Sequence, residues 1–348
     1  MPELRYHSLL DRWVILAPER EGRPCDQEDR ILPLPRECPF CPGNESSTPP
    51  EIARLPRPAA QGEGGDWKIR VVPNKYPALV PDIIHKHPLP NGKEGIFGFR
   101  DGTGIHEVII ESPDHRAGFP DMEGEHITEV FRVWADRIRA SYREHNLAHA
   151  LVFKNHRARA GASLSHPHSQ LIASPLVPKN VRQKMESSRT YFEGNNACLI
   201  CEILKLEKKS GERIIDDSGG FTMLAPYASR FPYEVFIAPS AHGEDFTRVS
   251  DEDLCRLAFG LRKMLRKLKG LLDDPPYNLA LITAPNISAL DCEAGPIPPE
   301  VYFHWHIEIM PRLAKVAGFE WGSGFHINTV APEEAARRLR EYPTGENG

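Results

Sequence analysis

Apolar residues recur at three- and four-residue spacing in two separate segments of the chain. The two stripes are Ile127, Val130, Phe131, Trp134 and Ile138, and Leu254, Leu257, Leu261, Met264, Leu265 and Leu268. Residues with this spacing lie on one side of an α-helix. We therefore predict two amphipathic helices. Asp251 and Asp253 suit the first turn of the second helix, with Ser250 as its N-cap.

Two other segments alternate in the manner of strands, and each contains two histidines one residue apart. These are SHPHSQLIAS at 165–174 and FHWHIEIMP at 303–311. In the second, His304, His306 and Glu308 would share one face of a strand, because successive side chains point to opposite sides. We predict strands that carry a polar working face.

The elements follow each other in the same order twice. A C-x-x-C pair precedes an apolar run that ends in histidine (106–115 and 233–242), a helix, a strand-like run (150–155 and 278–286) and the H-x-H segment. The two apolar runs align at Glu107/Glu234, Val108/Val235, Ile110/Ile237 and His115/His242. We predict an α+β fold of two pseudo-two-fold-related repeats, 1–182 and 183–348, each an antiparallel sheet with packed helices. A polar seam near 180–195 would separate them, and 286–300 would form a long loop.

Composition narrows the class of protein. The chain has 348 residues, 40% of them hydrophobic, and a formal net charge of −5, which disfavours binding to nucleic acid. The first residues lack a signal-peptide pattern, and no run approaches 18 apolar residues, so we expect a cytoplasmic protein without membrane association. Seven cysteines, an odd number that includes two C-x-x-C pairs, suit metal binding better than disulfides.

The repeated cysteines and histidines predict two metal sites. Thiolate and imidazole are ligands that zinc prefers, and four protein ligands make a structural site that is closed to water. The alternative is that the cysteines are ordinary buried residues and the histidines ordinary surface ones, but the repeated order disfavours it. The first predicted site is Cys38, Cys41, His115 and His166. The second is Cys198, Cys201, His242 and His304.

The second histidine of the first pair is the candidate for chemistry. His168 lies two residues beyond a predicted metal ligand, and a neutral imidazole can attack phosphorus without a separate base. Gln170, again two residues on, would donate a hydrogen bond to a phosphoryl oxygen. Asn155 and the segment 157–163, which ends in Ser163, offer further donors for phosphate.

HPHSQ preceded by GAS, with CPFC, SPDH and NKYPAL upstream, resembles the galactose-1-phosphate uridylyltransferase branch of the histidine triad superfamily. The similarity runs over nearly the whole chain. It implies tandem histidine-triad-like repeats, structural zinc and a homodimer whose partner subunit completes the active site. It also implies ping-pong transfer of a nucleoside monophosphate from a nucleotide sugar to a hexose 1-phosphate through a covalent nucleotidyl-histidine.

The resemblance also assigns residues. His168 matches the nucleophile, and Gln170, Ser163 and Asn155 match positions that contact phosphoryl groups. Cys38, Cys41, His115 and His166 match the zinc ligands of the family, whereas several family members lack the cysteines of the second set. Arg20, Arg23 and Asn74 match positions on the nucleotide side, and Glu320 matches a carboxylate that binds the hexose.

The interpretation that we favour is a UDP-glucose:hexose-1-phosphate uridylyltransferase of galactose metabolism. Lys75, where better known uridylyltransferases have an acidic residue, resembles a plant-like branch and favours ADP-glucose phosphorylase or adenylyltransferase as the alternative. Two alternatives of other classes are a histidine triad nucleotide hydrolase and a non-enzymatic zinc-ribbon interaction module. Gln170 argues against the hydrolase, because an amide is a poor proton donor or acceptor for attack by water. The absence of a basic stripe argues against the interaction module.

Overall fold

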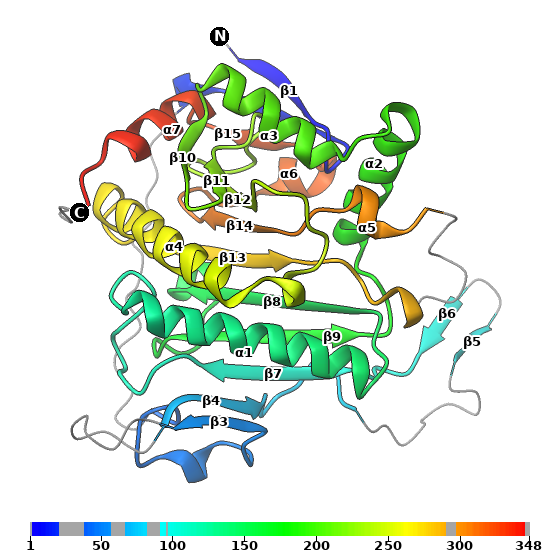
Figure 1. The fold of residues 1–348 in the computed structure, drawn as a ribbon, viewed down its shortest axis with the longest axis vertical. Coiled ribbons are helices and arrows are strands. Elements are labelled where there is room, and N and C mark those ends of the chain that lie inside the picture. Colours follow the sequence, from blue (N-terminus) through cyan, green and yellow to red (C-terminus); the bar gives the residue numbers. More distant parts are fainter. Residues whose placement is uncertain are drawn as a thin grey trace.

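One ten-stranded antiparallel sheet runs through the molecule, and two long helices cover one of its faces (Figure 1). This computed structural model describes residues 2–20, 38–56, 67–81, 91–94, 97–289 and 297–344. Arg23, one of the predicted nucleotide-side residues, lies outside the described residues. The α+β class and the packing of helices on an antiparallel sheet are as predicted.

The order of strands in the main sheet is symmetric about its centre. It reads β10-β11-β12-β14-β13-β8-β9-β7-β4-β3, so each strand of one half has a counterpart at the same distance from the β8–β13 pair. The strands are β3 (Ala53–Pro56), β4 (Trp67–Pro73), β7 (Ile105–Ile110), β8 (His149–His156), β9 (His168–Ser174), β10 (Ile214–Ser218), β11 (Phe221–Leu224), β12 (Val235–Pro239), β13 (Tyr277–Ile282) and β14 (His306–Pro311). This arrangement is the pseudo-two-fold repeat that the order of motifs predicts.

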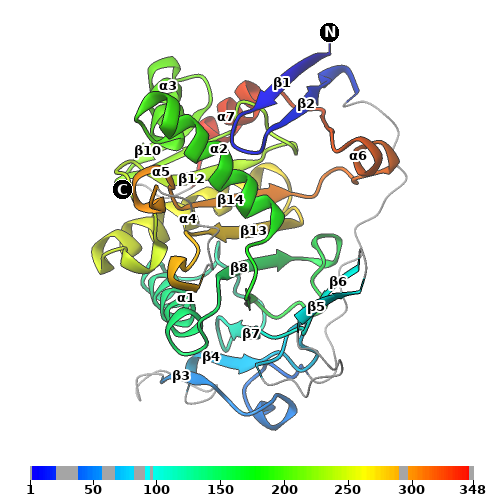
Figure 2. The same ribbon diagram turned by 90° about the vertical axis from the view of Figure 1, so that its right-hand side faces the viewer.

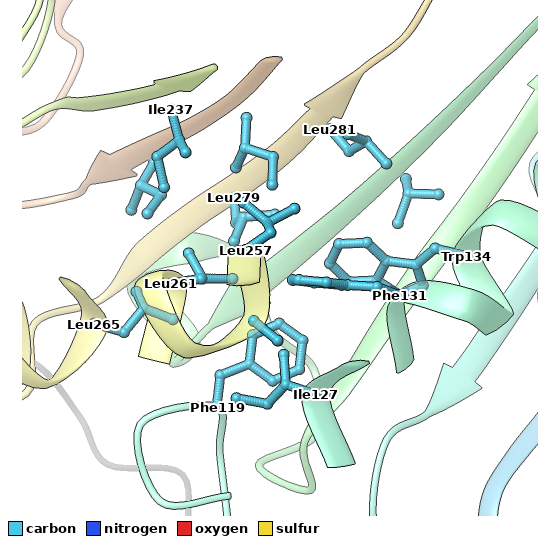
Figure 3. Close-up of a cluster of buried hydrophobic side chains, with 14 of the residues drawn as sticks. Phe119, Ile127, Phe131, Trp134, Ile237, Leu257, Leu261, Leu265, Leu279 and Leu281 are labelled. Atoms are coloured by element: carbon cyan, nitrogen blue, oxygen red, sulfur yellow. The ribbon is translucent and has the colours of Figure 1, made fainter. Parts of the chain in front are cut away.

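Both predicted amphipathic helices are present and pack side by side on the sheet. They are α1 (Gly124–Arg143) and α4 (Asp251–Leu271). Their apolar stripes meet inward-facing strand residues in one continuous core, in which Phe131, Trp134 and Leu261 are fully buried (Figure 3). The hydroxyl of Ser250 accepts a hydrogen bond from the Asp253 amide at 3.1 Å, which confirms the predicted N-cap.

The opposite face of the sheet is covered differently in its two halves. Helices α2 (Lys179–Asn195) and α3 (Leu199–Ser210) lie over the second half (Figure 2), where Met185 and Phe192 of α2 pack beside Tyr302 and Phe303. The polar stretch expected to be a seam between the repeats is therefore a covering helix, because its few apolar residues find a buried partner surface. Strands from before and after this stretch belong to the same ten-stranded sheet.

The ends of the described chain meet in a small second sheet. β1 (Glu3–His7) and β2 (Arg12–Leu16) form a hairpin, and β15 (His326–Asn328) pairs in parallel with β2. The N-terminal strands thus lie against the C-terminal part of the chain. The remaining strands and α-helices are β5 (Asn91–Glu94), β6 (Phe97–Arg100), α5 (Pro299–Tyr302), α6 (Gly318–Ser323) and α7 (Pro332–Glu341). The division at residue 182 stays a prediction.

The strand register corrects one detail of the predicted repeat. Val108 pairs with Gln170, whereas Phe236 pairs with Glu308, so Val108 corresponds to Phe236 and not to Val235. Val235 lies instead on the face covered by α1 and α4. A shift of one residue moves a side chain to the other face of a sheet. The connection to the downstream histidine absorbs the difference.

No helix among the described residues combines the length and the apolar composition that a membrane span requires.

Candidate active site and metal groups

The first group of predicted metal ligands converges as expected. The Cys41 Sγ lies 3.2 Å from the His115 Nδ1 and 3.6 Å from the His166 Nδ1, and the Cys38 Sγ lies 3.7 Å from the same His166 atom. All four ligand atoms lie within 4.8 Å of one another. Residues from three distant segments therefore come together beside the start of β9.

The second group repeats this arrangement in the other half. The Cys201 Sγ lies 3.4 Å from the His242 Nδ1 and 3.5 Å from the His304 Nδ1. The Cys198 Sγ lies 3.9 Å from the His304 Nδ1. These four ligand atoms also lie within 4.8 Å of one another.

Both groups fit a tetrahedral ion of the zinc type. Metal–sulfur and metal–nitrogen bonds of about 2.3 and 2.0–2.1 Å at tetrahedral angles place sulfur roughly 3.6 Å from nitrogen, close to the distances above. The other nitrogen of each buried histidine donates to a carbonyl, from His166 to Ser112 at 2.7 Å and from His304 to Pro239 at 3.1 Å. This hydrogen bond leaves a lone pair on Nδ1 for a metal. The two Cys2His2 groups could therefore each hold a metal ion.

The backbone and the surrounding side chains fix the ring of His168. Its Nδ1 lies 2.8 Å from the His166 carbonyl, so Nδ1 carries the proton and Nε2 has the free lone pair. The side chain is only 6% exposed, and the Phe40 ring meets it edge-on at 5.4 Å. Burial lowers the pKa of His168 to about 4. The imidazole is therefore neutral at pH 7 and has one nucleophilic nitrogen.

A buried ion pair lies behind this strand. The Lys154 ammonium on β8 contacts the Glu111 carboxylate and donates to the His168 carbonyl at 3.2 Å. Both charged side chains are almost completely buried. Because Lys154 binds the main-chain carbonyl of His168, this ion pair helps to position the candidate nucleophile.

His168 lies at the border of two cavities. The larger, about 450 Å³, is lined by Phe40, Asn74, Lys75, Tyr76, Val108, Ser163, Leu164, His168 and Gln170 among others. The smaller, about 100 Å³, is lined by Asn155, Arg157, His166 and His168 among others. The larger cavity combines apolar walls with a few polar groups, as small-molecule sites do.

The structure brings most of the predicted substrate-binding residues to these cavities. Asn74, Ser163 and Gln170 line the larger one, and Asn155 lines the smaller one. Arg157, in the segment expected to bind phosphate, pairs with Asp274 at 2.7 Å. The guanidinium of Arg157, which we expected to bind a phosphate, is therefore paired with a carboxylate.

Two predicted residues lie elsewhere. Arg20 ends a short 3-10 helix, is exposed and lines neither of the two cavities. Glu320 lies in α6, where its carboxylate accepts a hydrogen bond from the Ala317 amide at 3.0 Å, and it too is absent from both linings.

The second H-x-H pair has the same backbone geometry and different surroundings. The His306 Nδ1 donates to the His304 carbonyl at 2.9 Å, but its Nε2 accepts from the Lys184 ammonium at 2.8 Å. The Phe236 ring stacks on the imidazole at 4.7 Å. Glu308, in the place of Gln170, pairs with Lys184 and Arg230. The Nε2 lone pair and one ring face of His306 are thus occupied, as expected of a structural histidine.

Sequence reasoning missed several residues of the site. Glu111 and Lys154 have no motif, and their pairing depends on tertiary structure. In the sequence, His106 is simply the first residue of the apolar run 106–115. The alternation of that strand could have revealed it, because His106, Val108 and Ile110 share the face that carries His168.

Comparisons with known proteins agree with this geometry. The family model described as "Galactose-1-phosphate uridyl transferase, N-terminal domain" matches residues 1–178, and its C-terminal counterpart matches residues 184–345. An ADP-glucose phosphorylase of Arabidopsis thaliana is 36% identical and covers 98% of this chain and 93% of its own length. A galactose-1-phosphate uridylyltransferase of Thermotoga maritima is 32% identical and covers 98% of each chain.

Solved structures show the same relationship. A crystal structure of an ADP-glucose phosphorylase from Arabidopsis thaliana with bound ADP-glucose aligns with a TM-score of 0.80 at 34% identity, over 99% of both chains. A uridylyltransferase structure aligns with a TM-score of 0.72 at 26% identity, over 98% of this chain and 97% of that one. Paired metal-ligand groups, an anchored histidine beside a cavity and these matches over nearly the whole length together establish that the chain is an enzyme of the galactose-1-phosphate uridyl transferase family.

Proposed function

We propose that this enzyme transfers a nucleoside monophosphate from a nucleotide sugar to a second phosphate acceptor through a covalent intermediate on His168. One observation carries the proposal. The His168 Nε2 has a free lone pair beside a cavity large enough for a nucleotide, while its Nδ1 proton is held by the His166 carbonyl. His306 has the same backbone contact, but its Nε2 is occupied.

The reaction has two displacements at one phosphorus. The His168 Nε2 attacks the α-phosphorus, an N–P bond forms, and the bond to the sugar phosphate breaks with its electron pair on the leaving oxygen. The Nδ1–H bond to the His166 carbonyl stabilises the cationic ring in the adduct. An oxygen of the acceptor then attacks phosphorus and the N–P bond breaks, which returns the neutral imidazole.

Gln170, Ser163 and Asn155 contribute donors to the phosphoryl oxygens in this proposal. Gln170 and Ser163 line the cavity that contains His168, and Asn155 lines the adjoining one. Charge grows on these oxygens as phosphorus is attacked, so preorganised donors lower the barrier. Asn74 and Lys75, which also line the larger cavity, would contact the nucleotide.

Zinc is the metal that the two Cys2His2 groups suit best. With four protein ligands each, the ions would be structural and would supply no open coordination position. Bound at His166, the first ion would hold the residue whose carbonyl orients the His168 ring.

The donor nucleotide has two candidates. UDP-glucose with a hexose 1-phosphate acceptor is supported by the similarity to galactose-1-phosphate uridylyltransferases. ADP-glucose with inorganic phosphate as acceptor is favoured by the position of Lys75 in the cavity and by the similarity to the Arabidopsis ADP-glucose phosphorylase. In both schemes the first step releases glucose 1-phosphate and leaves the nucleotide on His168.

A homodimer would account for the position of Glu320. This residue lies outside the cavities of its own chain, while Phe319 and Trp321 beside it are 50% and 80% exposed. We propose that α6 of one subunit supplies the hexose contact to its partner. Mixing His168→Ala chains with Glu320→Gln chains would then restore activity to about a quarter of wild type, since half of the dimers are mixed and each has one intact site. A monomer in sedimentation would exclude this arrangement.

The labelling experiment tests the mechanism and the base together. Purified protein is incubated in parallel with UDP-glucose and ADP-glucose, each labelled at the α-phosphate, and acid-labile label on the protein is measured. We expect label with one of the two donors and its loss in His168→Ala. Discharge of the adduct by hexose 1-phosphate or by inorganic phosphate then identifies the acceptor.

His145→Ala is the control, because His145 is an exposed histidine away from the site. It should retain full labelling. Label that persists in His168→Ala, or an active wild type without label, would contradict the covalent mechanism.

A further inference from the structure

The Gln170 amide is held in one orientation. It lies on the same face of β9 as His168, and its side-chain oxygen receives two hydrogen bonds. His106 Nε2 lies 2.8 Å from this oxygen, and Asn74 Nδ2 lies 3.3 Å from it. The Gln170 nitrogen has no hydrogen-bond partner among the described residues, and the side chain lines the cavity of about 450 Å³. Which end of the amide faces the cavity decides whether Gln170 donates or accepts there.

The backbone determines the protonation of His106. The Ala78 amide, which can only donate, lies 3.0 Å from the His106 Nδ1. Nδ1 must therefore accept, and the single proton of the neutral ring is on Nε2. Because Nε2–H is a donor, the Gln170 atom that it meets is the oxygen.

A second backbone amide fixes Asn74 in the same way. The Tyr76 amide donates to the Asn74 Oδ1 at 2.9 Å, so the other end of that side chain is the nitrogen. This nitrogen donates to the Gln170 oxygen at 3.3 Å. It also lies 3.1 Å from the His106 Nε2, which carries a proton and therefore does not accept from it. Two side chains, each oriented by a main-chain N–H, thus specify one orientation of Gln170.

Building on the proposed function, we propose that His106 is a positioning residue that locks the Gln170 amide with its nitrogen toward the α-phosphoryl group. Gln170 is then a donor only at the cavity. It can stabilise a phosphoryl oxygen as charge develops, and it offers no acceptor for the proton of an attacking water. The lock therefore favours transfer to a phosphate acceptor over hydrolysis of the nucleotidyl-enzyme.

The second repeat lacks this arrangement. Glu308 replaces the glutamine, and a carboxylate has no donor to orient. Its oxygens are paired with cations from α2 and from the segment before β12, Lys184 and Arg230. The lock belongs to the half that carries the proposed nucleophile.

A double-mutant cycle tests the proposal on the full-length, metal-loaded enzyme. The variants are His106→Phe, His106→Gln, Gln170→Ala and the His106→Phe/Gln170→Ala pair. His106→Phe should lower kcat for transfer on the order of 10-fold with little change in KM, since a misoriented donor is lost in the transition state. The ratio of hydrolysis to transfer should rise several-fold. His106→Gln, which keeps a donor at this reach, should restore both values.

The cycle separates positioning from general damage. In the Gln170→Ala background, His106→Phe should change kcat less than about two-fold, because residues that act through each other are not additive. A full additional loss would show that His106 does not act through Gln170. An unchanged His106→Phe single variant would overturn the proposal as well.

Nitrogen-15 NMR of the imidazoles gives a readout that needs no activity. We expect the Nε2–H tautomer for His106 in the wild type, and the Nδ1–H tautomer would overturn the lock whether or not the enzyme is active. Conversely, a wild type with the expected tautomer but without a nucleotidyl adduct would reject the proposed function, and with it the catalytic role of the lock.

Discussion

His168 and His306 are nearly identical residues at the level of local backbone. Each donates its Nδ1 proton to the carbonyl of the histidine two residues earlier. The difference lies at Nε2, which borders a cavity in one case and accepts from Lys184 in the other. The chemistry available to a histidine here is set by its neighbours in space.

Another buried histidine affects stability with pH. His149 at the start of β8 is 1% exposed, and neither ring nitrogen has a hydrogen bond to the described residues. Burial lowers its pKa to about 4 from an ordinary value of 6.5. Between pH 4 and pH 6.5 the unfolded chain therefore binds more protons than the folded chain. The stability associated with a neutral His149 is fully present above pH 6.5 and is lost as the pH falls toward 4.

We predict that His149→Leu removes this dependence. At pH 7.5 the free energy of unfolding of the variant should exceed that of the wild type by roughly 1–3 kcal/mol, because two buried nitrogens without partners are removed. The advantage should grow by roughly another 3 kcal/mol as the pH falls to 4. Denaturant unfolding at several pH values measures it. A constant difference between variant and wild type would show that His149 does not titrate as stated.

At the scale of elements, faces of strands and covering helices decide what each half can do. In the first half, the face of β7 and β9 that carries His106 and His168 borders a cavity. In the second half, α2 lies over the equivalent face and inserts Lys184, which is 2% exposed. Lys184 contacts the His306 Nε2 at 2.8 Å and the Glu308 carboxylate at 2.5 Å. Lys184 thus occupies the space next to the His306 Nε2, and the cavity on this face is lined by Phe236 and Glu308 but not by His306.

We predict that Lys184→Met strongly destabilises the protein. Without Lys184, the buried cluster has one cation, Arg230, for the two carboxylates of Glu234 and Glu308. One negative charge is then uncompensated, which costs about 3–5 kcal/mol. Lys184→Met/Glu308→Gln should recover much of this loss, since both charges are then absent. Chemical denaturation gives the free energies of unfolding.

Lys205→Met is the matched control. Lys205 lies on the neighbouring helix α3, and its side chain is 75% exposed beside Glu202, so its loss should change stability by less than about 0.5 kcal/mol. Equal effects of the two lysine variants would contradict the assignment of Lys184 to a buried charge cluster.

At the scale of the whole molecule, pseudo-symmetry makes one half an internal control for the other. Each half has a Cys2His2 group, and only the first lies next to the proposed nucleophile. The main-chain carbonyl of His166 orients His168, while the carbonyl of His304 orients an occupied ring. Loss of a metal should therefore have different consequences in the two halves.

We predict that Cys41→Ser and Cys201→Ser each lower the bound zinc from about two ions to about one per chain. Both should lower the thermal midpoint. Cys41→Ser should also abolish most nucleotidyl transfer, because the anchor of the His168 strand is lost, whereas Cys201→Ser should retain transfer below its unfolding range. Elemental analysis, thermal unfolding and the labelling assay measure the three effects. A folded wild type without zinc would refute the metal assignment.

Much of this organisation can be predicted from local patterns. Helical spacing predicts α1 and α4, and strand alternation places His304, His306 and Glu308 together. The order of motifs predicts the repeat and both ligand groups, because each ligand has a recognisable residue type at a recurring position. The alignment of the two apolar runs predicts a register that differs by one residue from the structure, because matching residue types do not specify which face of the sheet a side chain takes.

The sequence by itself determined which residue types were available for chemistry and in what order: two sets of cysteines and histidines, and one H-x-H followed by glutamine. The tertiary structure alone decided which histidine keeps a free nitrogen, that Lys154 and Glu111 lie behind it, and that His106 and Asn74 orient Gln170. The physical reason is that periodicity records the burial of a side chain within its own element. Tautomers, ion pairs and cavities depend instead on atoms contributed by segments far apart in the chain.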